Sequence, residues 1–256
     1  MLSLISPAKK LDFEDPAHLG THSKPEFLDE ARELVSILKN KSRGELKSLM
    51  GISDNLAELN YNRYQSFKTP FNLSNAKQAV LTFQGDTYKG LDAASLSESD
   101  LNFAQDHLRV LSGLYGLLRP LDLMQPYRLE MGTKLSNSEG EDLYDFWSDE
   151  LTKACNETVL EYKHKAVVNL ASKEYISAID PDALNVPFIT CHFKKIKDGK
   201  ARVIGILAKK ARGMMARYII QNRIEDPEGL KSFKKDGYQY SADDSTQSDL
   251  VFVQTE

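Results

Sequence analysis

Short apolar runs that are typical of buried strands occur along the whole 256-residue chain, and their distribution limits the folds open to it. The clearest runs cover residues 2–6, 108–111, 167–170, 188–196 and 250–253. Segments with apolar residues at helical spacing lie between them, and no low-complexity linker or internal repeat divides the chain. We therefore predict one mixed α/β (α+β) domain over residues 1–256, in which helices wrap a β-sheet core.

Capping signals mark the first helices. Ser23 and Ser42 are each followed three residues later by a glutamate, which is the pattern of a capping box. Apolar residues then recur at helical spacing over residues 27–38 and 46–50, and a third helix is expected at residues 55–63. The first quarter of the chain is therefore predicted to be mainly helical after one strand.

The rest of the chain alternates between helix and strand patterns. We expect helices at residues 100–107, 141–162 and 209–223, and further strands at residues 79–83, 201–207 and 238–240. The strand at residues 79–83 is expected to lead into a loop at residues 84–90. Residues 114–118 are very apolar and precede Pro120, so they predict a short helix. Asp198 and Gly199 lie between two apolar runs and predict the turn of a β-hairpin.

The composition restricts the class of protein. The chain carries a net charge of −4 and is 41% hydrophobic and 27% charged, as expected of an ordinary globular protein. Cys155 and Cys191 provide no disulfide framework, and no apolar run approaches the roughly 18 residues of a membrane span. The first residues lack the basic and apolar regions of a signal peptide. These features predict a cytoplasmic protein that is not inserted in a membrane.

Basic residues are concentrated in one part of this weakly acidic chain. Nine lysines and arginines lie between His192 and Arg217, with Asp198 as the single acid. At about 100° per residue, the helix expected at residues 209–223 places its cations on one side and most of its apolar residues on the other. Such a face can contact phosphate groups, and an ordinary solvent-exposed helix face has the same pattern.

One segment, residues 109–132, combines turn residues, arginines and core-type apolar residues. Glycine permits close approach of the backbone, and arginine presents a planar group that binds phosphate or carboxylate. The conspicuous residues of the segment are Ser112, Gly113, Gly116, Arg119, Pro120, Arg128 and Glu130. A plain core element does not require this mixture, so we interpret the segment as the wall of a functional site.

This segment and several other blocks resemble the YaaA family of peroxide-stress proteins, over essentially the whole chain. The other blocks are residues 5–13, 83–90, 143–147, 167–172 with Glu174 and Tyr175, and 208–213 with Arg217. The resemblance implies a cytosolic protein that binds double-stranded DNA and limits oxidative damage by holding down free iron. It also implies a β-sheet core with an apolar inner helix, for which residues 114–118 are the candidate.

The resemblance further implies a helix-hairpin-helix element, in which glycines let backbone N–H groups meet DNA phosphates. The segment from Ser112 to Gly116 is the best candidate for it. Gly113 and Gly116 are three residues apart, whereas the usual motif spaces its glycines by two. A glycine-rich turn that lets a strand pack against a buried helix is the alternative.

Our first functional hypothesis is a protein that grips double-stranded DNA through its phosphates, largely independently of sequence. The hypothesis combines the family resemblance with the basic helix face. The predicted DNA contacts are Lys9, Lys10, Arg109, Gly113, Gly116, Arg119, Arg128, Lys209, Lys210, Arg212 and Arg217. Phosphate contacts of this kind make the affinity fall steeply with salt.

The rival hypothesis is an enzyme that acts on a nucleotide or a nucleic-acid base. Polar side chains near the ends of expected strands could supply acid, base and oxyanion-binding groups. The candidates are Asp86, Tyr88, Ser112, Arg128, Glu130 and Asn169. Structural alternatives stay open, because Arg128 and Glu130 could form an ion pair that holds a loop and Asp86 could close its own turn. Convergence of the candidates in one place would favour the enzyme.

We expect neither a cofactor nor a metal. The five histidines are scattered, and Cys191 and His192 lack further ligands at metal spacing. Neither cysteine lies in a block that matches the family, so a peroxide-reducing thiol is not expected. A role in peroxide stress would therefore be indirect.

Overall fold

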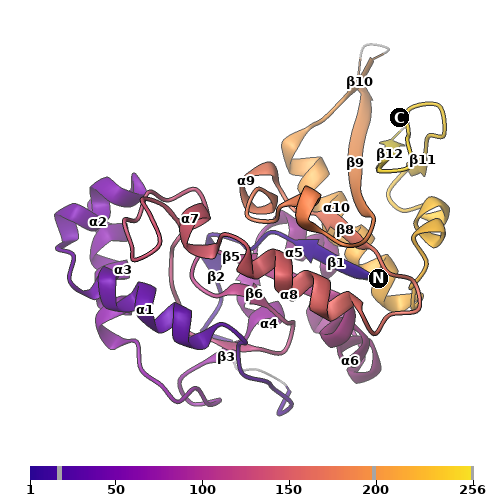
Figure 1. Cartoon of the computed structure of the whole chain (residues 1–256). Helices are drawn as coiled ribbons and strands as arrows, with labels where there is room; N and C mark the ends of the chain where they lie inside the picture. Colours follow the sequence, from indigo (N-terminus) through magenta and orange to yellow (C-terminus); the bar gives the residue numbers. More distant parts are fainter. Residues whose placement is uncertain (16–18, 198–199, 255–256) are drawn as a thin grey trace.

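A mostly parallel sheet of eight strands forms the centre of the computed structural model, which describes residues 1–15, 19–197 and 200–254 (Figure 1). The strands follow the order β11, β12, β9, β8, β1, β5, β6, and β10 pairs with β9. Their bounds are β1 Leu2–Ile5, β5 Leu108–Ser112, β6 Gly116–Leu118, β8 Val167–Leu170, β9 Phe188–Lys197, β10 Lys200–Arg202, β11 Tyr238–Tyr240 and β12 Asp249–Gln254. Strands from the start, middle and end of the chain therefore share one sheet, as the distribution of apolar runs predicts.

The strand β1 lies in the interior of this sheet. It pairs in parallel with β5 on one side and with β8 on the other. All residues of these three strands are buried. Strands that are covered on both faces are mostly apolar and do not alternate between polar and apolar residues. This explains why residues 2–6, 108–111 and 167–170 appear in the sequence as continuous apolar runs.

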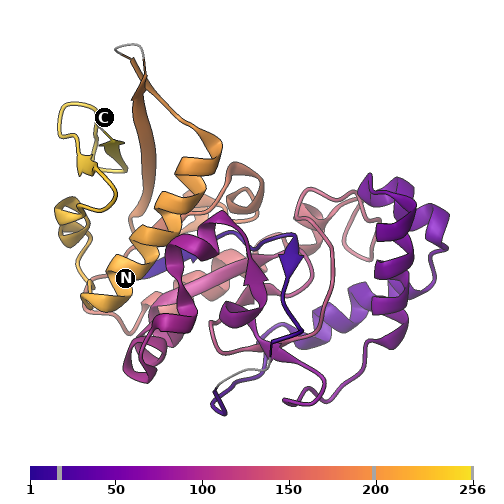
Figure 2. The same ribbon diagram turned by 180° about the vertical axis from the view of Figure 1, so that it is seen from behind.

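Helices pack on both faces of the sheet. On one face lie α6 (Glu98–His107) and α10 (Gly205–Gln221), and α5 (Asp86–Leu91) packs against α10 (Figure 2). On the other face α8 (Glu150–Val159) crosses β1 (Figure 1). The contact between α5 and α10 is very close, since a Cβ atom on Gly213 would lie 1.7 Å from the carbonyl oxygen of Thr87. Only glycine fits at such a position.

Three N-terminal helices form a group beside the sheet (Figure 1): α1 (Leu28–Lys39), α2 (Arg43–Met50) and α3 (Asp54–Ser66). The predicted capping box of α2 is confirmed, because the side chains of Ser42 and Glu45 each accept a hydrogen bond from the other residue's backbone N–H. The apolar residues of α1 face the core, as their spacing predicts.

The capping box predicted at Ser23 is wrong. The Ser23 hydroxyl donates a hydrogen bond of 2.6 Å to the Asp122 carboxylate, and the two residues form an isolated β-bridge. The helix α1 begins only at Leu28, without a side-chain cap. The Ser23 side chain therefore bonds to Asp122, which is distant in the sequence, and does not cap α1.

The segment that precedes residue 91 also differs from the prediction. The short helix α4 (Ala79–Thr82) replaces the strand expected at residues 79–83, and α5 replaces most of the loop expected at residues 84–90. Every residue of α4 is buried. A short run that is buried on all sides carries no periodicity that separates a helix from a strand.

The inner helix and the helix-hairpin-helix predicted around residues 112–118 are both wrong. This segment is a β-hairpin, in which β5 pairs antiparallel with β6 and Ser112 lies opposite Gly116. Gly116 has a φ of 63°, and a Cβ atom there would lie 2.9 Å from the Trp147 ring. Close packing thus explains the glycine at residue 116, and α4 is a short apolar helix that is buried at every residue.

Two further boundaries are corrected. The helix expected at residues 141–162 is divided into α7 (Leu143–Trp147) and α8 by Ser148, whose φ is 28°. The predicted hairpin of β9 and β10 is confirmed by the pairing of Lys197 with Lys200, and its turn residues Asp198 and Gly199 lie outside the described residues. The second strand ends at Arg202 because α10 begins three residues later.

Short elements complete the fold. They are β2 Lys10–Leu11, β3 Lys77–Gln78, β4 Phe83–Gln84, β7 Leu123–Met124, α9 Lys173–Ile176 and the 3-10 helices Ala93–Ser95, Pro181–Ala183 and Pro227–Ser232. In the described ranges no helix combines the length and the apolar character that crossing a membrane requires.

Candidate functional sites at the carboxyl edge of the sheet

The parallel strands β1, β5 and β8 end at the same edge of the sheet, and each is followed by or ends in a serine. The backbone N–H of Ser172 donates to Ser6 Oγ (2.8 Å), and the Ser6 hydroxyl donates to Ser172 Oγ (3.3 Å). The chain first adds β5 on one side of β1 and later adds β8 on the other side. Open α/β sheets bind their ligands at such a reversal of strand order.

Two buried tyrosines join these serines. The Tyr88 hydroxyl donates to the Ser6 carbonyl oxygen (3.1 Å), and the hydroxyls of Tyr127 and Ser112 lie 2.7 Å apart. Burial raises the pKa of both phenols above the usual value. Both phenols therefore stay protonated at neutral pH, and Tyr88 donates its hydroxyl proton in the hydrogen bond to the Ser6 carbonyl oxygen. We call Ser6, Tyr88, Ser112, Tyr127 and Ser172 the carboxyl-edge cluster.

An ion pair network borders this cluster. Residues 127–131 alternate between buried and partly exposed positions, so Arg128 and Glu130 point outward from an extended segment. Arg128 Nη2 lies 3.1 Å from one oxygen of the Glu130 carboxylate, and Lys9 Nζ lies 2.6 Å from the other. The predicted pair of Arg128 and Glu130 is thus present, and Lys9 extends it to an ion triad.

The remaining two catalytic candidates serve local structure. Asp86 lies in the first turn of α5 and pairs with Lys89 at 3.5 Å. The Asn169 side chain donates to Thr190 Oγ1 (3.3 Å) and accepts from the backbone N–H of Ala171 (2.8 Å). Asn169 lies near the carboxyl end of β8 and bonds to the residue before Ser172, so five of the six candidates lie around the carboxyl edge, while Asp86 lies in α5.

The structure disperses the predicted DNA contacts and uses several of them inside the fold. Arg109 is buried and donates to the carbonyl oxygens of Gln105 and Leu108. Arg119 pairs with Asp122, Arg217 donates to the carbonyls of Leu91 and Asp92, and Lys210 pairs with Asp236. Arg128 belongs to the ion triad. A buried or paired cation is poorly placed to contact a DNA backbone.

The two glycines predicted to meet DNA phosphates are also enclosed. A Cβ atom on Gly113 would lie 2.4 Å from the carbonyl oxygen of Leu129, and the Gly113 carbonyl accepts a hydrogen bond from the Trp147 indole (3.1 Å). The hairpin turn therefore packs against the segment that carries Arg128, and its backbone faces protein.

The basic face of α10 is narrower than its periodicity predicts. Ala211, Met215 and Ile219 are buried as expected, but Gly213 and Ala216 are buried as well. The reason is that α10 contacts α5 and α6 in addition to the sheet. The predicted contacts that stay exposed without an ion pair among the described residues are Lys10 and Lys209.

A second group of cations lies on the strands β9 and β10. Lys195 is directly opposite Arg202, and Lys197 is directly opposite Lys200. Opposite residues of an antiparallel pair share one face of the sheet, as do residues two apart on one strand. These four cations therefore cover one face of a hairpin that projects from the sheet (Figure 1). We call them the basic arm.

The sequence predicts this hairpin and shows a concentration of cations around it, but the four arm residues were not among the predicted DNA contacts. The signal was present, because the predicted hairpin implies that cations on its two strands lie opposite each other, and the pairing of Lys197 with Lys200 bears this out. In the part of the chain that the structure describes, none of the four arm residues forms an ion pair.

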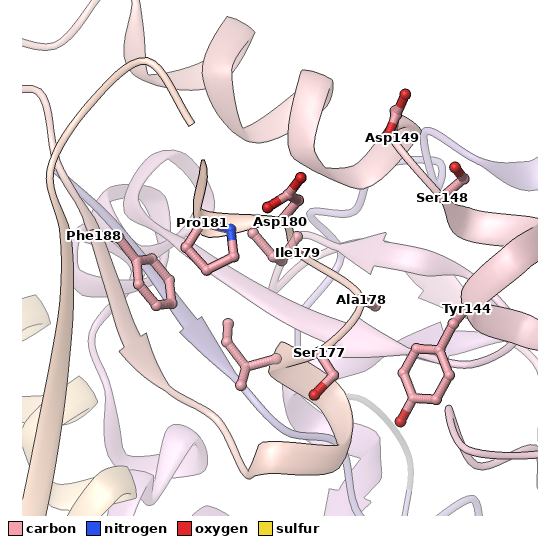
Figure 3. Close-up of a pocket in the computed structure, with 10 residues that line it drawn as sticks. Tyr144, Ser148, Asp149, Ser177, Ala178, Ile179, Asp180, Pro181 and Phe188 are labelled. Carbon is pink, nitrogen blue, oxygen red and sulfur yellow. The ribbon is translucent and has the colours of Figure 1, made fainter. Parts of the chain in front are cut away.

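A cavity of about 470 Å³ lies between the junction of α7 with α8 and the segment that follows α9 (Figure 3). Tyr144, Ser148 and Asp149 line one side of it, and residues 176–181 with Phe188 line the rest. The Tyr144 hydroxyl donates to the Glu174 carbonyl oxygen (2.8 Å), which connects this cavity to the segment after β8. None of the predicted catalytic residues lines it.

The two cysteines are remote from solvent. Both are buried, and burial raises the pKa of Cys155 and of Cys191 to about 12. The reactive thiolate is therefore scarce at neutral pH. Over the described ranges, no three His, Cys, Asp or Glu side chains gather as metal ligands would.

Comparisons with known proteins decide the family. A family model described as peroxide stress protein YaaA matches residues 1–244. The chain belongs to this family. Among YaaA relatives named UPF0246 protein, one from Hahella chejuensis is 54% identical over 241 residues, which is 94% of each chain. One from Burkholderia orbicola is 51% identical over 98% of each chain, and one from Alteromonas mediterranea is 50% identical over 100% of this chain and 99% of its own.

Membership of the YaaA family confirms the resemblance seen in the sequence blocks and supports a role in the peroxide stress response.

Proposed function

We propose that the protein acts in the peroxide stress response by binding double-stranded DNA through the basic arm, largely independently of sequence. The observation that carries this proposal is the pairing of like charges across the hairpin, Lys195 with Arg202 and Lys197 with Lys200. Like charges directly opposite each other destabilise a β pair by roughly 0.2–1 kcal/mol. A polyanion that lies along this face removes the repulsion.

The position of the arm supports the same proposal. The strand β9 pairs with β8 only as far as Thr190 and then continues for seven residues. At about 3.3 Å per residue, this extension reaches roughly 20 Å beyond β8. The first turn of α10 follows directly and contains neither an acid nor a side-chain cap, so its free N–H groups add a site that favours phosphate. Lys209 on the same helix is exposed.

The test is a salt series of duplex binding for the wild type and for a variant with all four arm residues changed to alanine. Each phosphate contact contributes about 0.9 to the slope of log K against log salt, so the variant should lose about 3.6 of it. Between 50 and 200 mM salt the wild-type affinity should therefore fall about 150-fold more than that of the variant. An unchanged slope would refute the arm as the DNA contact.

A matched control removes the same charge elsewhere. Lys24, Lys134, Lys153 and Lys165 are exposed and form no ion pairs within the described residues. Their joint replacement by alanine should change the slope much less than the arm variant. The arm variant should melt no lower than the wild type, because its substitutions remove repulsion.

We also propose that the protein works in the cytoplasm, limits free iron and so reduces iron-driven damage to DNA, as the family resemblance implies. The expected result in cells without the gene is more chelatable iron and greater peroxide sensitivity, with an unchanged rate of peroxide removal. Slower peroxide removal in such cells would instead indicate a peroxidase.

A further inference from the structure

The side chain of Arg128 carries a hydrogen-bond donor that the described part of the protein leaves without an acceptor. The side chain is only 17% exposed, and its Nε atom is buried and unbonded. Its Nη2 atom is used by Glu130. A buried donor without a partner costs free energy, so an acceptor from outside the chain is favoured at this position.

A second guanidinium group, that of Arg63, lies near enough for the charge of Arg128 to act on it. The Tyr64 hydroxyl donates to the Arg128 carbonyl oxygen and so joins α3 to the segment that carries Arg128. Burial lowers the pKa of the Arg63 guanidinium, and the positive charge of Arg128 lowers it further. Arg63 donates to Asn60 Oδ1 (3.2 Å), and among the described side chains no carboxylate forms an ion pair with it.

The local charges do not balance. Arg63, Arg128 and Lys9 supply three positive charges, and Glu130 supplies one negative charge within the ion triad. The nearby Glu174 carboxylate accepts from the backbone N–H of Gly132 (3.3 Å), and a positive surplus persists when it is counted. The two arginines are partly buried, whereas the Lys9 side chain is 61% exposed, and partly buried cations in surplus favour a bound anion.

The geometry indicates what kind of anion fits. Arginine presents parallel N–H groups that bind phosphate or carboxylate with two hydrogen bonds. A phosphate monoester carries about 1.5 to 2 negative charges at neutral pH, which is close to the local surplus. The neighbouring carboxyl-edge cluster lies at the edge of the sheet where such folds bind ligands.

We propose that Arg63, Arg128 and Lys9 form a binding site for the terminal phosphate of a small phosphorylated molecule, with Glu130 as an internal competitor for the two cations of the ion triad. The site is separate from the basic arm and does not depend on DNA binding. A terminal phosphate is a dianion, whereas a phosphate within a duplex backbone is a monoanionic diester, so the two ligands can be distinguished.

The test is calorimetric titration of the purified full chain with inorganic phosphate, adenosine 5′-monophosphate and adenosine. Phosphate and the nucleotide should bind, and adenosine should not. Arg63→Gln and Arg128→Gln should each weaken binding by about 10-fold or more, as expected for a charge-assisted hydrogen bond. Arg32→Gln is the control, since Arg32 is an exposed arginine that pairs with Asp29, and it should leave binding unchanged.

The variant Glu130→Gln gives the sharper result, because it removes the competitor and keeps the shape of the side chain. It should tighten phosphate binding several-fold, which a general loss of structure cannot do. The proposal is overturned if Glu130→Gln weakens binding, or if neither the wild type nor this variant binds phosphate at millimolar concentration. It is also overturned if the four-alanine arm variant loses phosphate binding, because the ligand would then lie on the arm.

Discussion

Replacing Gly213 by alanine should destabilise the protein, although alanine is the better helix former. A Cβ atom at this position would lie 1.7 Å from the carbonyl oxygen of Thr87 and 2.8 Å from the backbone nitrogen of Leu91. Both atoms belong to the backbone of α5, so no side chain can rotate away. The helices α5 and α10 must move apart, and α10 also packs on the sheet.

The magnitude follows from two opposing terms. Overpacking of a core costs typically 1–3 kcal/mol, and a contact with rigid backbone at this distance places the cost at about 3 kcal/mol or more. Alanine in place of glycine within a helix returns about 1 kcal/mol. The net loss is therefore about 2 kcal/mol, which for a chain of this length lowers the melting temperature by about 4–8 °C.

The assay is thermal unfolding followed by circular dichroism, with Gly44→Ala as the matched control. Gly44 lies in α2, and a Cβ atom there would meet nothing within 4 Å. This control should melt at the wild-type temperature or about 1–4 °C above it, since it gains helix propensity without a clash. A Gly213→Ala protein that melts as high as the control would show that α5 and α10 do not pack as closely as described.

Three further predictions concern the cap of α2, the two thiols and the stability of the protein at acidic pH. Ser42→Ala should cost about 1 kcal/mol in urea unfolding by removing the capping box of α2, whereas Ser48→Ala on the same helix should be nearly neutral. Cys155 and Cys191 should react with a thiol reagent only after denaturation, and their joint replacement by alanine should leave peroxide removal unchanged; rapid labelling of the native protein would contradict this. The Arg223 hydrogen bond lowers the pKa of Asp100 below its ordinary value, so its stabilisation is present above the unfolded-state pKa of about 3.9 and is lost as the pH falls through the folded-state pKa. Asp100→Asn should therefore lower the free energy of unfolding at pH 7, and this free energy should fall less steeply below pH 4 than it does in the wild type.

Local patterns predicted the elements well where neighbouring residues in the sequence determine the structure. The capping box at Ser42 and the apolar runs of β1, β5 and β8 are confirmed. The prediction failed where a distant contact decides the outcome. Gly90 suggested a loop, yet it lies in the helix α5. Glycine is required at this helical position because a side chain there would clash with the Lys210 carbonyl oxygen of α10. No local pattern reports a contact between helices that are more than 100 residues apart.

The candidate site was likewise predictable only where local patterns in the sequence indicate it. Serines and charged residues at the ends of strands indicated the carboxyl edge, and Tyr88, Ser112, Arg128 and Glu130 do gather there. Arg63 could not be found, because it is an ordinary helical arginine until the fold brings Tyr64 against the Arg128 carbonyl. Conversely, Arg109 was predicted to contact DNA because it is basic, but it lies in the buried strand β5 and is itself buried.

The interior position of β1 has a consequence for synthesis on the ribosome. Its residues precede those of β5 by more than 100 positions and those of β8 by more than 160. At about 5–20 residues per second, β1 leaves the ribosome roughly 8–30 s before β8 exists. Until β5 is made both edges of β1 are open, and until β8 is made one edge stays open to other nascent chains. A ribosome that stalls before residue 167 therefore carries a chain with an unpaired, aggregation-prone strand edge.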